Sequence, residues 1–227
     1  MNRNEADVVI DNLESSARAT DSAKRRRTRA ALIDAAFDVF SVHGLSGATV
    51  AQVTQAAGFT RGAFYSNFES KEELMLAVMD RERESATARM SGYIEHLADE
   101  DGDDDFSIDD LTETLMQVLT IGTAQRDWQL ALMEALPVTM RDPVLAERQS
   151  EIRARAEADA RLLVTQGLGR LGRQPTIDTD LLVLVLLGVI ERSLADALLQ
   201  SRLDAFPRRA GSAIAAVLLH SSAPVES

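Results

Sequence analysis

The chain has no cysteine, and its 227 residues include only 5 prolines, 12 glycines and 4% aromatic residues. The absence of cysteine excludes disulfide bonds, thiolate zinc sites and cysteine nucleophiles. Because proline and glycine are rare while alanine and leucine are abundant, helix is favoured over sheet. The length suffices for a substantial core in one domain or two, so we expect an all-α protein.

Long hydrophobic runs are also missing. The most apolar stretch, residues 181–190, is ten residues long and ends at Glu191, which is about half of a membrane span. The N-terminus is polar and lacks the apolar run that a targeting signal requires. We therefore interpret 181–190 as a buried helix, expect no membrane partner, and predict a cytoplasmic protein.

Residues suited to catalysis or metal binding do not cluster along the sequence. An acidic stretch with Asp101, Asp103 and Asp105 resembles the start of a calcium loop. The positions that need glycine and glutamate in such a loop hold Phe106 and Thr112 instead. The histidines lie far apart in sequence: they are His43, His96 and His220. Fingerprints of serine hydrolases, P-loops and dinucleotide sites are absent, so we expect no enzyme activity, no cofactor and no metal ion.

Charge is distributed unevenly along the chain. The formal net charge is −12, yet residues 24–71 hold seven cationic side chains against three acidic ones. The residues that follow are strongly acidic, so a polyanion would be attracted to one end of the protein only. Residues 1–23 are polar, mixed in charge and aperiodic, which predicts a disordered arm.

Local signals predict four successive helices after this arm. The second begins with a capping box, in which Thr49 and Gln52 each satisfy the other residue's backbone amide, and it stops at Gly58. Ser70 and Glu73 form a second box at the start of the fourth helix. The predicted ranges are 30–43, 49–57, 60–68 and 70–97.

The second and third of these helices meet the requirements of a helix-turn-helix. Gly58 can adopt the positive φ that the tight turn needs. The third helix begins with short or hydrogen-bonding residues, from Thr60 to Ala63, so its backbone can approach a DNA major groove. Apolar residues can hold the crossing of the two helices, namely Val50, Val53, Ala57, Phe59 and Phe64. We expect Phe64 and Phe68 to belong to the core rather than to stack on bases.

Several segments occur in a specific order and spacing: 29–40, Gly44, Thr49–Val50, 56–60, 64–68 and 70–74. With them, residues 28–79 resemble the N-terminal domain of the TetR family of bacterial regulators. One departure is Thr54, where the family usually has alanine packed between the two helices. The rest of the chain agrees with the family only in length and helical character.

The resemblance implies which residues bind DNA. Arg61, Gly62 and Ala63 would face base edges, and Arg61 suits a bidentate contact to guanine. Phosphates would be contacted by Thr49, Thr60, Tyr65 and Lys71. The basic run would lie along the DNA backbone or enter the minor groove: it comprises Lys24, Arg25, Arg26 and Arg27. Without the resemblance, such a run is more often a solvated helix flank.

Two domains are predicted after the arm. Residues 24–84 would form the DNA-binding domain, with its helix-turn-helix at 49–68. Residues 85–221 would form a helical-bundle domain for effector binding and dimerisation. Its further helices are expected at 108–124, 128–140, 144–168, 178–201 and 206–220, and no strand or internal repeat is predicted.

The last two predicted helices indicate a homodimer. Residues 181–190 have no polar face, so that helix must be covered on all sides. Pairing of the last two helices across a two-fold axis would produce a four-helix interface. Its predicted residues are Leu184, Gly188, Glu191, Ala195, Ala210, Ile214, Val217 and Leu218. Burial within one subunit is the alternative.

A site for a small hydrophobic effector is predicted between residues 108 and 140, where apolar side chains alternate with polar ones that can orient a ligand. Its candidate residues are Met116, Leu119, Gln125, Trp128, Gln129, Met133 and Glu134. The same stripe is also typical of an ordinary core. The predicted function is a ligand-responsive repressor that binds palindromic double-stranded DNA as a dimer in the bacterial cytoplasm. The alternative is a helical scaffold or small-molecule binder without specific DNA readout.

Overall fold

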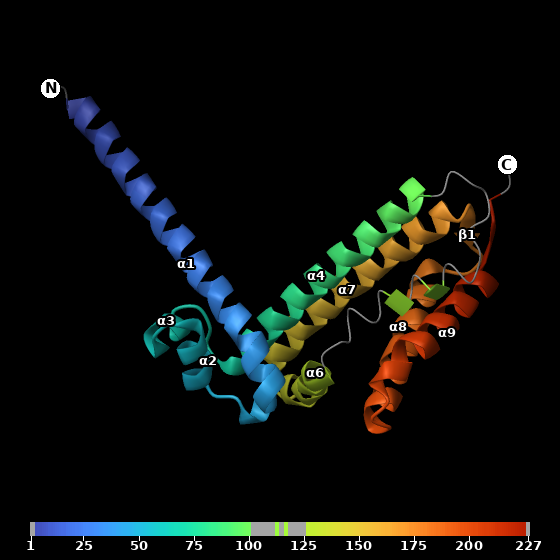
Figure 1. Cartoon of the computed structure of the whole chain (residues 1–227). Helices are drawn as coiled ribbons and strands as arrows, with labels where there is room; N and C mark the ends of the chain where they lie inside the picture. The colour runs from blue at the N-terminus through green and yellow to red at the C-terminus, as the bar shows by residue number, and fades with distance from the viewer. Residues whose placement is uncertain (1–2, 101–111, 114–115, 118–125, 226–227) are drawn as a thin grey trace. The chain divides into compact units, whose positions relative to one another are not determined.

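The computed structural model describes residues 3–100, 112–113, 116–117 and 126–225 (Figure 1). In this part, helices and one pair of short strands make up the regular structure, which confirms the helical fold class. The chain divides into two compact units, Met1–Val78 and Met79–Ser227. Both this division and the predicted boundary at 84/85 fall inside one helix, α4 (Lys71–Glu100).

The first unit contains the predicted helix-turn-helix. Its helices are α1 (Arg3–Gly47), α2 (Val50–Ala57), α3 (Arg61–Tyr65) and the first two turns of α4. Gly44, with φ 67° and ψ 172°, interrupts α1 where the first helix was predicted to end. The buried side chains come from all four helices and include Leu32, Ala36, Phe40, Val53, Phe64, Phe68, Leu74 and Val78.

The N-terminal segment differs from the disordered arm predicted for residues 1–23, because α1 begins at Arg3. No glycine or proline occurs before Gly44. The sequence therefore contains no helix breaker between Arg3 and the part of α1 that packs in the core, which includes Leu32 and Phe40. Extending an existing helix costs far less than nucleating one.

Helix α3 is shorter than predicted, since it ends at Tyr65 rather than near Phe68. The Ser66 hydroxyl donates to the carbonyl of Gly62 (2.9 Å), and the Asn67 amide donates to that of Ala63 (2.8 Å). These side chains compete with the backbone for the last carbonyls of the helix, which ends it early.

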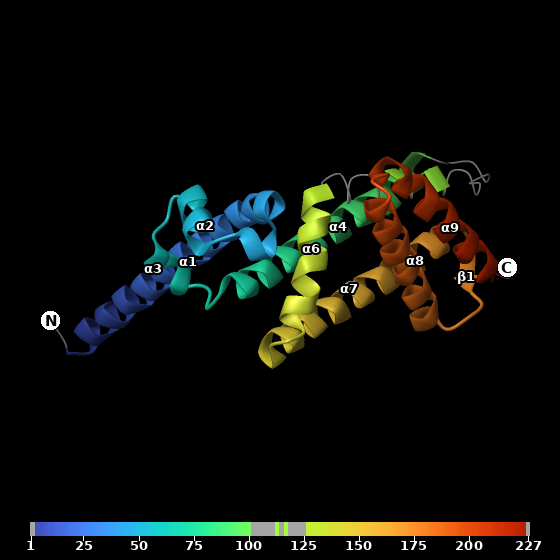
Figure 2. The same cartoon turned by 90° about the horizontal axis from the view of Figure 1, so that it is seen from below.

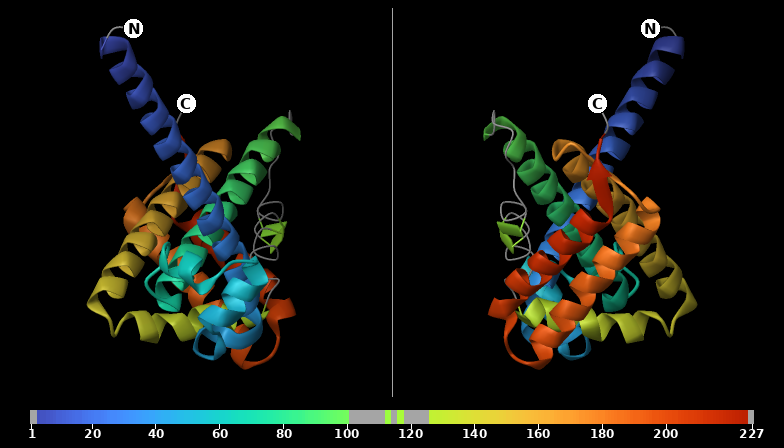
Figure 3. Two further views of the ribbon diagram at one scale, coloured as in Figure 1. Left: turned by 90° about the vertical axis from the view of Figure 1, so that its left-hand side faces the viewer. Right: turned by 90° about the vertical axis from the view of Figure 1, so that its right-hand side faces the viewer.

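The second unit continues α4 and adds α6 (Arg126–Thr139), α7 (Pro143–Arg170), α8 (Thr179–Leu199) and α9 (Phe206–His220). A short 3-10 helix, Leu203–Ala205, precedes α9. Figures 2 and 3 show α8 and α9 side by side. Leu182 and Leu186 of α8 pack there with Ile214 and Leu218 of α9 and with Leu168 of α7.

Two short strands correct the prediction that the chain has none. Strand β1 (Arg173–Pro175) pairs antiparallel with β2 (Ser222–Pro224), with Gln174 opposite Ala223. Arg173 also donates from Nε to the Ser222 hydroxyl (2.8 Å) and from Nη2 to the Ser222 carbonyl (2.6 Å). Segments of three residues carry no readable alternation, and this pairing joins positions 49 residues apart, so sequence patterns do not indicate it.

The predicted helix 108–124 lies mostly outside the described residues; the four positions described there, 112–113 and 116–117, are helical. No helix in the described ranges combines the length and apolarity needed to cross a membrane.

Candidate nucleic-acid interface

The start of α2 is held by the predicted capping box. The Thr49 hydroxyl accepts from the Gln52 amide (3.2 Å), and Gln52 Oε1 accepts from the Thr49 amide (2.8 Å). The Thr49 hydroxyl also donates to Gln52 Oε1 (2.7 Å). The box is therefore confirmed, and the one hydroxyl hydrogen of Thr49 is engaged within the protein.

The turn between α2 and α3 is built on Gly58, at φ 71° and ψ 28°. Its amide donates to the Gln55 carbonyl, and the amide of Phe59 donates to the Thr54 carbonyl (2.9 Å). This is the hydrogen-bond pattern of a helix end that requires a left-handed residue. An alanine or larger residue at position 58 would be strained in this conformation.

Thr54, the departure from the family pattern, is buried against the crossing of the two helices. Its hydroxyl lies within hydrogen-bond distance of the carbonyls of Val50 (2.9 Å) and Ala51 (3.1 Å). The polar group is thus satisfied within α2, and the turn keeps its hydrogen bonds.

The first turn of α3 faces solvent. Thr60, Arg61 and Gly62 are exposed, while Ala63 is half-buried. The Thr60 hydroxyl caps the helix by accepting from the Ala63 amide (3.2 Å). A Cβ placed on Gly62 would meet only the Thr60 hydroxyl, at 3.7 Å. Packing against the described residues therefore gives no reason for glycine at this position.

The opposite face of α3 is anchored in the core, as predicted for Phe64 and Phe68. Both rings are buried, with centroids 5.9 Å apart. Tyr65 touches the edge of Phe64 (5.2 Å between centroids) but is 61% exposed. The core thus fixes α3 by its aromatic face and leaves Arg61 and Tyr65 toward solvent.

Lys71 makes contacts that the sequence did not indicate. The side chain is half-buried. Its ammonium group donates to the carbonyls of Leu45 (2.7 Å), Ala48 (2.9 Å) and Ser46 (3.2 Å). An ammonium group has three donors, so its hydrogens are directed into the connection between α1 and α2. Lys71 ties that connection to the start of α4, whereas the resemblance implied a phosphate contact.

The second capping box differs slightly from its prediction. The Ser70 hydroxyl accepts from the Glu73 amide (3.1 Å), as expected. The Glu73 carboxylate accepts from the amide of Glu69 (2.6 Å), one residue before the predicted position.

Exposed basic side chains extend along α1. Lys24, Arg25, Arg26 and Arg27 are all exposed, and Arg26 Nη1 donates to the Ser22 hydroxyl (2.7 Å). Sequence reasoning missed Arg29, whose guanidinium carbon lies 4.8 Å from the centroid of the Phe68 ring. Cation–π contact restrains this guanidinium. No local pattern could have revealed it, because the two residues are 39 positions apart.

The predicted effector residues are distributed differently in the second unit. Trp128 (5% exposed) and Gln129 are buried, and Met116 and Glu134 are half-buried. Met133 is exposed, contrary to a role in lining an interior cavity. Leu119 and Gln125 lie outside the described residues.

The predicted dimer residues fall into two groups. Leu184, Gly188 and Glu191 of α8 are exposed, and Ala195 and Val217 are half-buried. The other three are buried in the core of the unit, where they pack with residues of the same chain: Ala210, Ile214 and Leu218. The spacing of apolar residues identifies a buried face of α9 but does not say whether the same chain or a second copy covers it.

Helix α8 keeps an apolar stripe that no described part of the chain covers. Leu181, Leu184 and Val185 are exposed, Leu184 to 65%. With Gly188 one turn further on, this α8 stripe runs along two turns of the helix.

Comparisons with known proteins bear on both units. Residues 32–78 match the family of bacterial regulatory proteins, tetR family. Over 58 residues the chain is 46% identical to the HTH-type transcriptional regulator SrpR of Pseudomonas putida, a match that covers 26% of this chain and 27% of SrpR. The chain thus spans about a quarter of the length of this curated relative.

Two solved structures share the fold at low sequence identity. One is SmeT, the repressor of the Stenotrophomonas maltophilia multidrug efflux pump SmeDEF, with a TM-score of 0.57, 20% identity and coverage of 86% of this chain and 90% of that one. The other is Bacillus subtilis FadR in complex with stearoyl-CoA, with a TM-score of 0.59, 17% identity and coverage of 83% and 96%. Residues 32–78 are thus the part of the chain that matches the tetR family of bacterial regulatory proteins, and the likeness to these two structures shows a common fold.

Proposed function

We propose that the protein is a sequence-specific transcriptional repressor that binds a palindromic operator as a homodimer and releases it when a small apolar effector binds. The observation that carries this proposal is the first turn of α3. Thr60 caps this turn and Arg61 is exposed on it. The turn also holds Gly62, and no neighbour among the described residues requires a glycine there.

DNA contacts can be assigned from the available donors. Arg61 is placed for a bidentate contact with guanine, and Gly62 lets the backbone approach the groove. Thr60 uses its hydroxyl oxygen as an acceptor in the cap, so its hydroxyl hydrogen remains for a phosphate. To donate to a phosphate, the Thr49 hydroxyl would first have to give up its hydrogen bond to Gln52 Oε1. The Tyr65 hydroxyl and the basic run at 24–27 supply further backbone contacts.

Arg29 is a better candidate phosphate ligand than Lys71. Arg29 is exposed and its guanidinium is restrained by Phe68, so little conformational entropy is lost on binding. The ammonium group of Lys71 donates to three carbonyls of the protein. We assign Lys71 an indirect role, in which it holds the α1–α2 connection against α4.

A homodimer would place two DNA-binding units on one operator. The α8 stripe is the apolar surface that a second copy would cover, and α9 would contribute through half-buried Val217. Two recognition helices related by a two-fold axis would enter major grooves about 34 Å apart, or a multiple of that spacing.

An effector site in the second unit is supported by its composition. Trp128 and Gln129 give the buried part of α6 a large aromatic ring and a polar amide, which are residue types that line apolar ligand sites. The fold is shared with a regulator solved with stearoyl-CoA. The effector would shift the population toward a form with low operator affinity, with α4, which belongs to both units, as the connecting element.

The decisive experiment selects duplexes from genomic fragments with the purified chain and compares the selected site with a scrambled duplex at about 150 mM salt. We expect an inverted repeat, a complex of two chains per site, and at least about a thousandfold preference for the repeat. Equal affinity for the two duplexes would contradict specific readout and favour a scaffold or small-molecule binder.

A further inference from the structure

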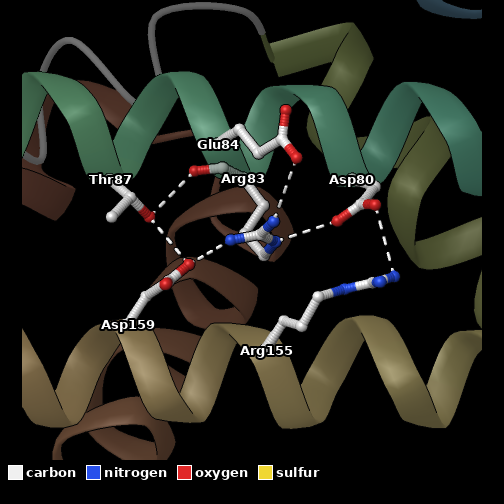
Figure 4. Close-up of polar contacts among 6 residues, drawn as sticks. All are labelled: Asp80, Arg83, Glu84, Thr87, Arg155 and Asp159. Carbon is white, nitrogen blue, oxygen red and sulfur yellow. Dashed lines mark hydrogen bonds and ion pairs between the residues drawn. The ribbon is translucent and has the colours of Figure 1, made fainter.

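A charged cluster joins α4 to α7 in the second unit (Figure 4). It consists of Asp80, Arg83 and Thr87 on α4 and of Arg155 and Asp159 on α7, and we name it the α4–α7 cluster. Arg83 Nε donates to Asp80 (3.0 Å), and Arg83 Nη1 donates to Asp159. Arg155 pairs with the other oxygen of Asp80 (3.2 Å), and the Thr87 hydroxyl lies 3.1 Å from Asp159.

Arg83 is the centre of the cluster. Only 15% of its side chain is exposed. It joins Asp80 and the more exposed Glu84 (3.4 Å) on its own helix to Asp159 on α7. Burial opposes the charged form, but the hydrogen bonds and charges of Asp80 and Asp159 outweigh it, so the pKa of Arg83 lies above its ordinary value. Other ion pairs of α7, Arg153–Glu191 and Arg161–Asp180, have both side chains about half-exposed or more.

The order of charges specifies the alignment of the two helices. Arg155 faces Asp80, and one turn further along both helices Asp159 faces Arg83 and Thr87. A slip of one turn in one direction would bring Arg155 toward Arg83, and a slip in the other would bring Asp159 toward Asp80. Both slips place like charges together in a partly desolvated setting, which is unfavourable.

The cluster begins where the first unit ends. Leu74, Met75 and Val78 of α4 are buried, and Asp80 follows Val78 by two residues on the same helix. Because α4 is one helix from Lys71 to Glu100, a change in how residues 80–87 lie on α7 would be passed along the helix toward residues 74–78.

We propose that the α4–α7 cluster is a positioning device, which holds α4 in one register on α7 and thereby sets the placement of the DNA-binding unit for operator binding. The inference rests on the proposed function for its consequence at the operator. Its structural part, a register set by Arg83, does not depend on DNA.

The absence of cysteine makes a direct distance measurement possible in the full-length chain. Spin labels are attached through Ala56→Cys in α2 and Ser150→Cys in α7, both exposed positions, and labelled protein is diluted with unlabelled chain. The distance distribution between the labels is compared for the parent, Arg83→Gln, Asp159→Asn and Arg83→Lys. Arg161→Gln, which removes an exposed α7–α8 ion pair, is the matched control.

We expect Arg83→Gln and Asp159→Asn to broaden or shift the distance distribution. Arg83→Lys should change it less, because lysine keeps the positive charge but lacks the planar guanidinium group that binds two carboxylates at once. Without labels, the first two variants should lose about tenfold in operator affinity, the equivalent of one hydrogen bond to a charged group. Their affinity for scrambled DNA should be unchanged, and the control should match the parent in both measurements.

Parent-like distances in both Arg83→Gln and Asp159→Asn would overturn the proposal, even with a lower melting temperature, because the cluster would then be a structural contact only. If the variants change the distances but the parent protein shows no preference for any operator, the role of the cluster in the register would stand and the proposed function would be refuted. Altered distances with an unchanged preference for the operator would refute the positioning role.

Discussion

At the scale of single residues, the interface is decided by which hydrogen bonds are already used. Thr60 keeps a free hydroxyl hydrogen, whereas Lys71 directs its ammonium group to three carbonyls. Two side chains to which the resemblance gave the same role therefore have different capacities for phosphate. Gly62 stands out because a Cβ there would meet only the Thr60 hydroxyl, at 3.7 Å, among the described residues, which agrees with the close approach to DNA that we propose.

Replacing Gly62 by alanine separates folding from DNA binding. Alanine should raise the free energy of unfolding by about 1 kcal/mol, because glycine is a poor helix former. The added methyl group would face the groove and weaken operator binding. Urea unfolding and gel shifts measure the two effects. The control is Gly92→Ala, at an exposed position of α4 with nothing within 4 Å; it should stabilise the fold and leave DNA binding unchanged. A Gly62→Ala protein with the parent's operator affinity would contradict a close approach of this backbone to the groove.

Lys71 and Arg29 are distinguished by the salt dependence of binding. Lys71→Met should lower the free energy of unfolding by about 2 kcal/mol through the lost charged hydrogen bonds. It should also weaken binding to every duplex, without changing the slope of log affinity against log salt. Arg29→Gln should reduce the slope of log affinity against log salt by about 0.9, the value for one phosphate contact. Fluorescence anisotropy across a salt series measures both slopes. A reduced slope for Lys71→Met would restore its predicted phosphate contact.

At the scale of elements, α8 and α9 show how a helix with apolar residues on several faces divides its contacts. Leu182 and Leu186 turn toward α9 and the core, while Leu184 and Val185 remain exposed. On α9, Ile214 and Leu218 are used within the unit. The surface left for a partner is therefore centred on α8.

Leu184→Glu should disrupt the dimer while leaving the fold of each chain intact. A carboxylate in a covered apolar interface would be desolvated without a partner, which should raise the dimer dissociation constant about a hundredfold or more. Sedimentation equilibrium measures association, and circular dichroism checks the helices. Met140→Glu, at an exposed residue that follows α6, should remain dimeric. A Leu184→Glu protein that associates like the parent would place the interface elsewhere.

At the scale of the whole molecule, charge is separated along the chain. The basic segment 24–71 is followed by acidic sequence, and the total is −12. Attraction to DNA is therefore confined to one unit, and the remaining charge opposes non-specific wrapping by the body of the protein. Under the proposed function, specific binding then depends on two DNA-binding units held at the correct spacing.

Altering the spacing of the operator tests this geometry. Inserting about five base pairs between the half-sites rotates them to opposite faces of the duplex. Affinity should then fall to the level of a scrambled duplex, as measured by anisotropy at fixed salt. Inserting the same bases outside the inverted repeat is the control. Unchanged affinity after the central insertion would show that the half-sites are read independently.

The sequence by itself determined the features that depend on near neighbours. The cap at Thr49, the left-handed turn at Gly58, the cap at Thr60 and the order of the helices follow from contacts within a few residues, and such contacts leave a local pattern. The buried aromatic pair Phe64 and Phe68 could be predicted for the same reason, because the helical period shows which side chains share a face.

Tertiary structure alone decided contacts between residues far apart in the chain. The ties from Lys71, the stacking of Arg29 on Phe68, the pairing of β1 with β2 and the bridge from Arg83 to Asp159 join positions 23 to 76 residues apart. It also decided that Ile214 and Leu218 serve the core of one chain. Periodicity shows that a face is apolar, but only the packed structure shows which surface covers it.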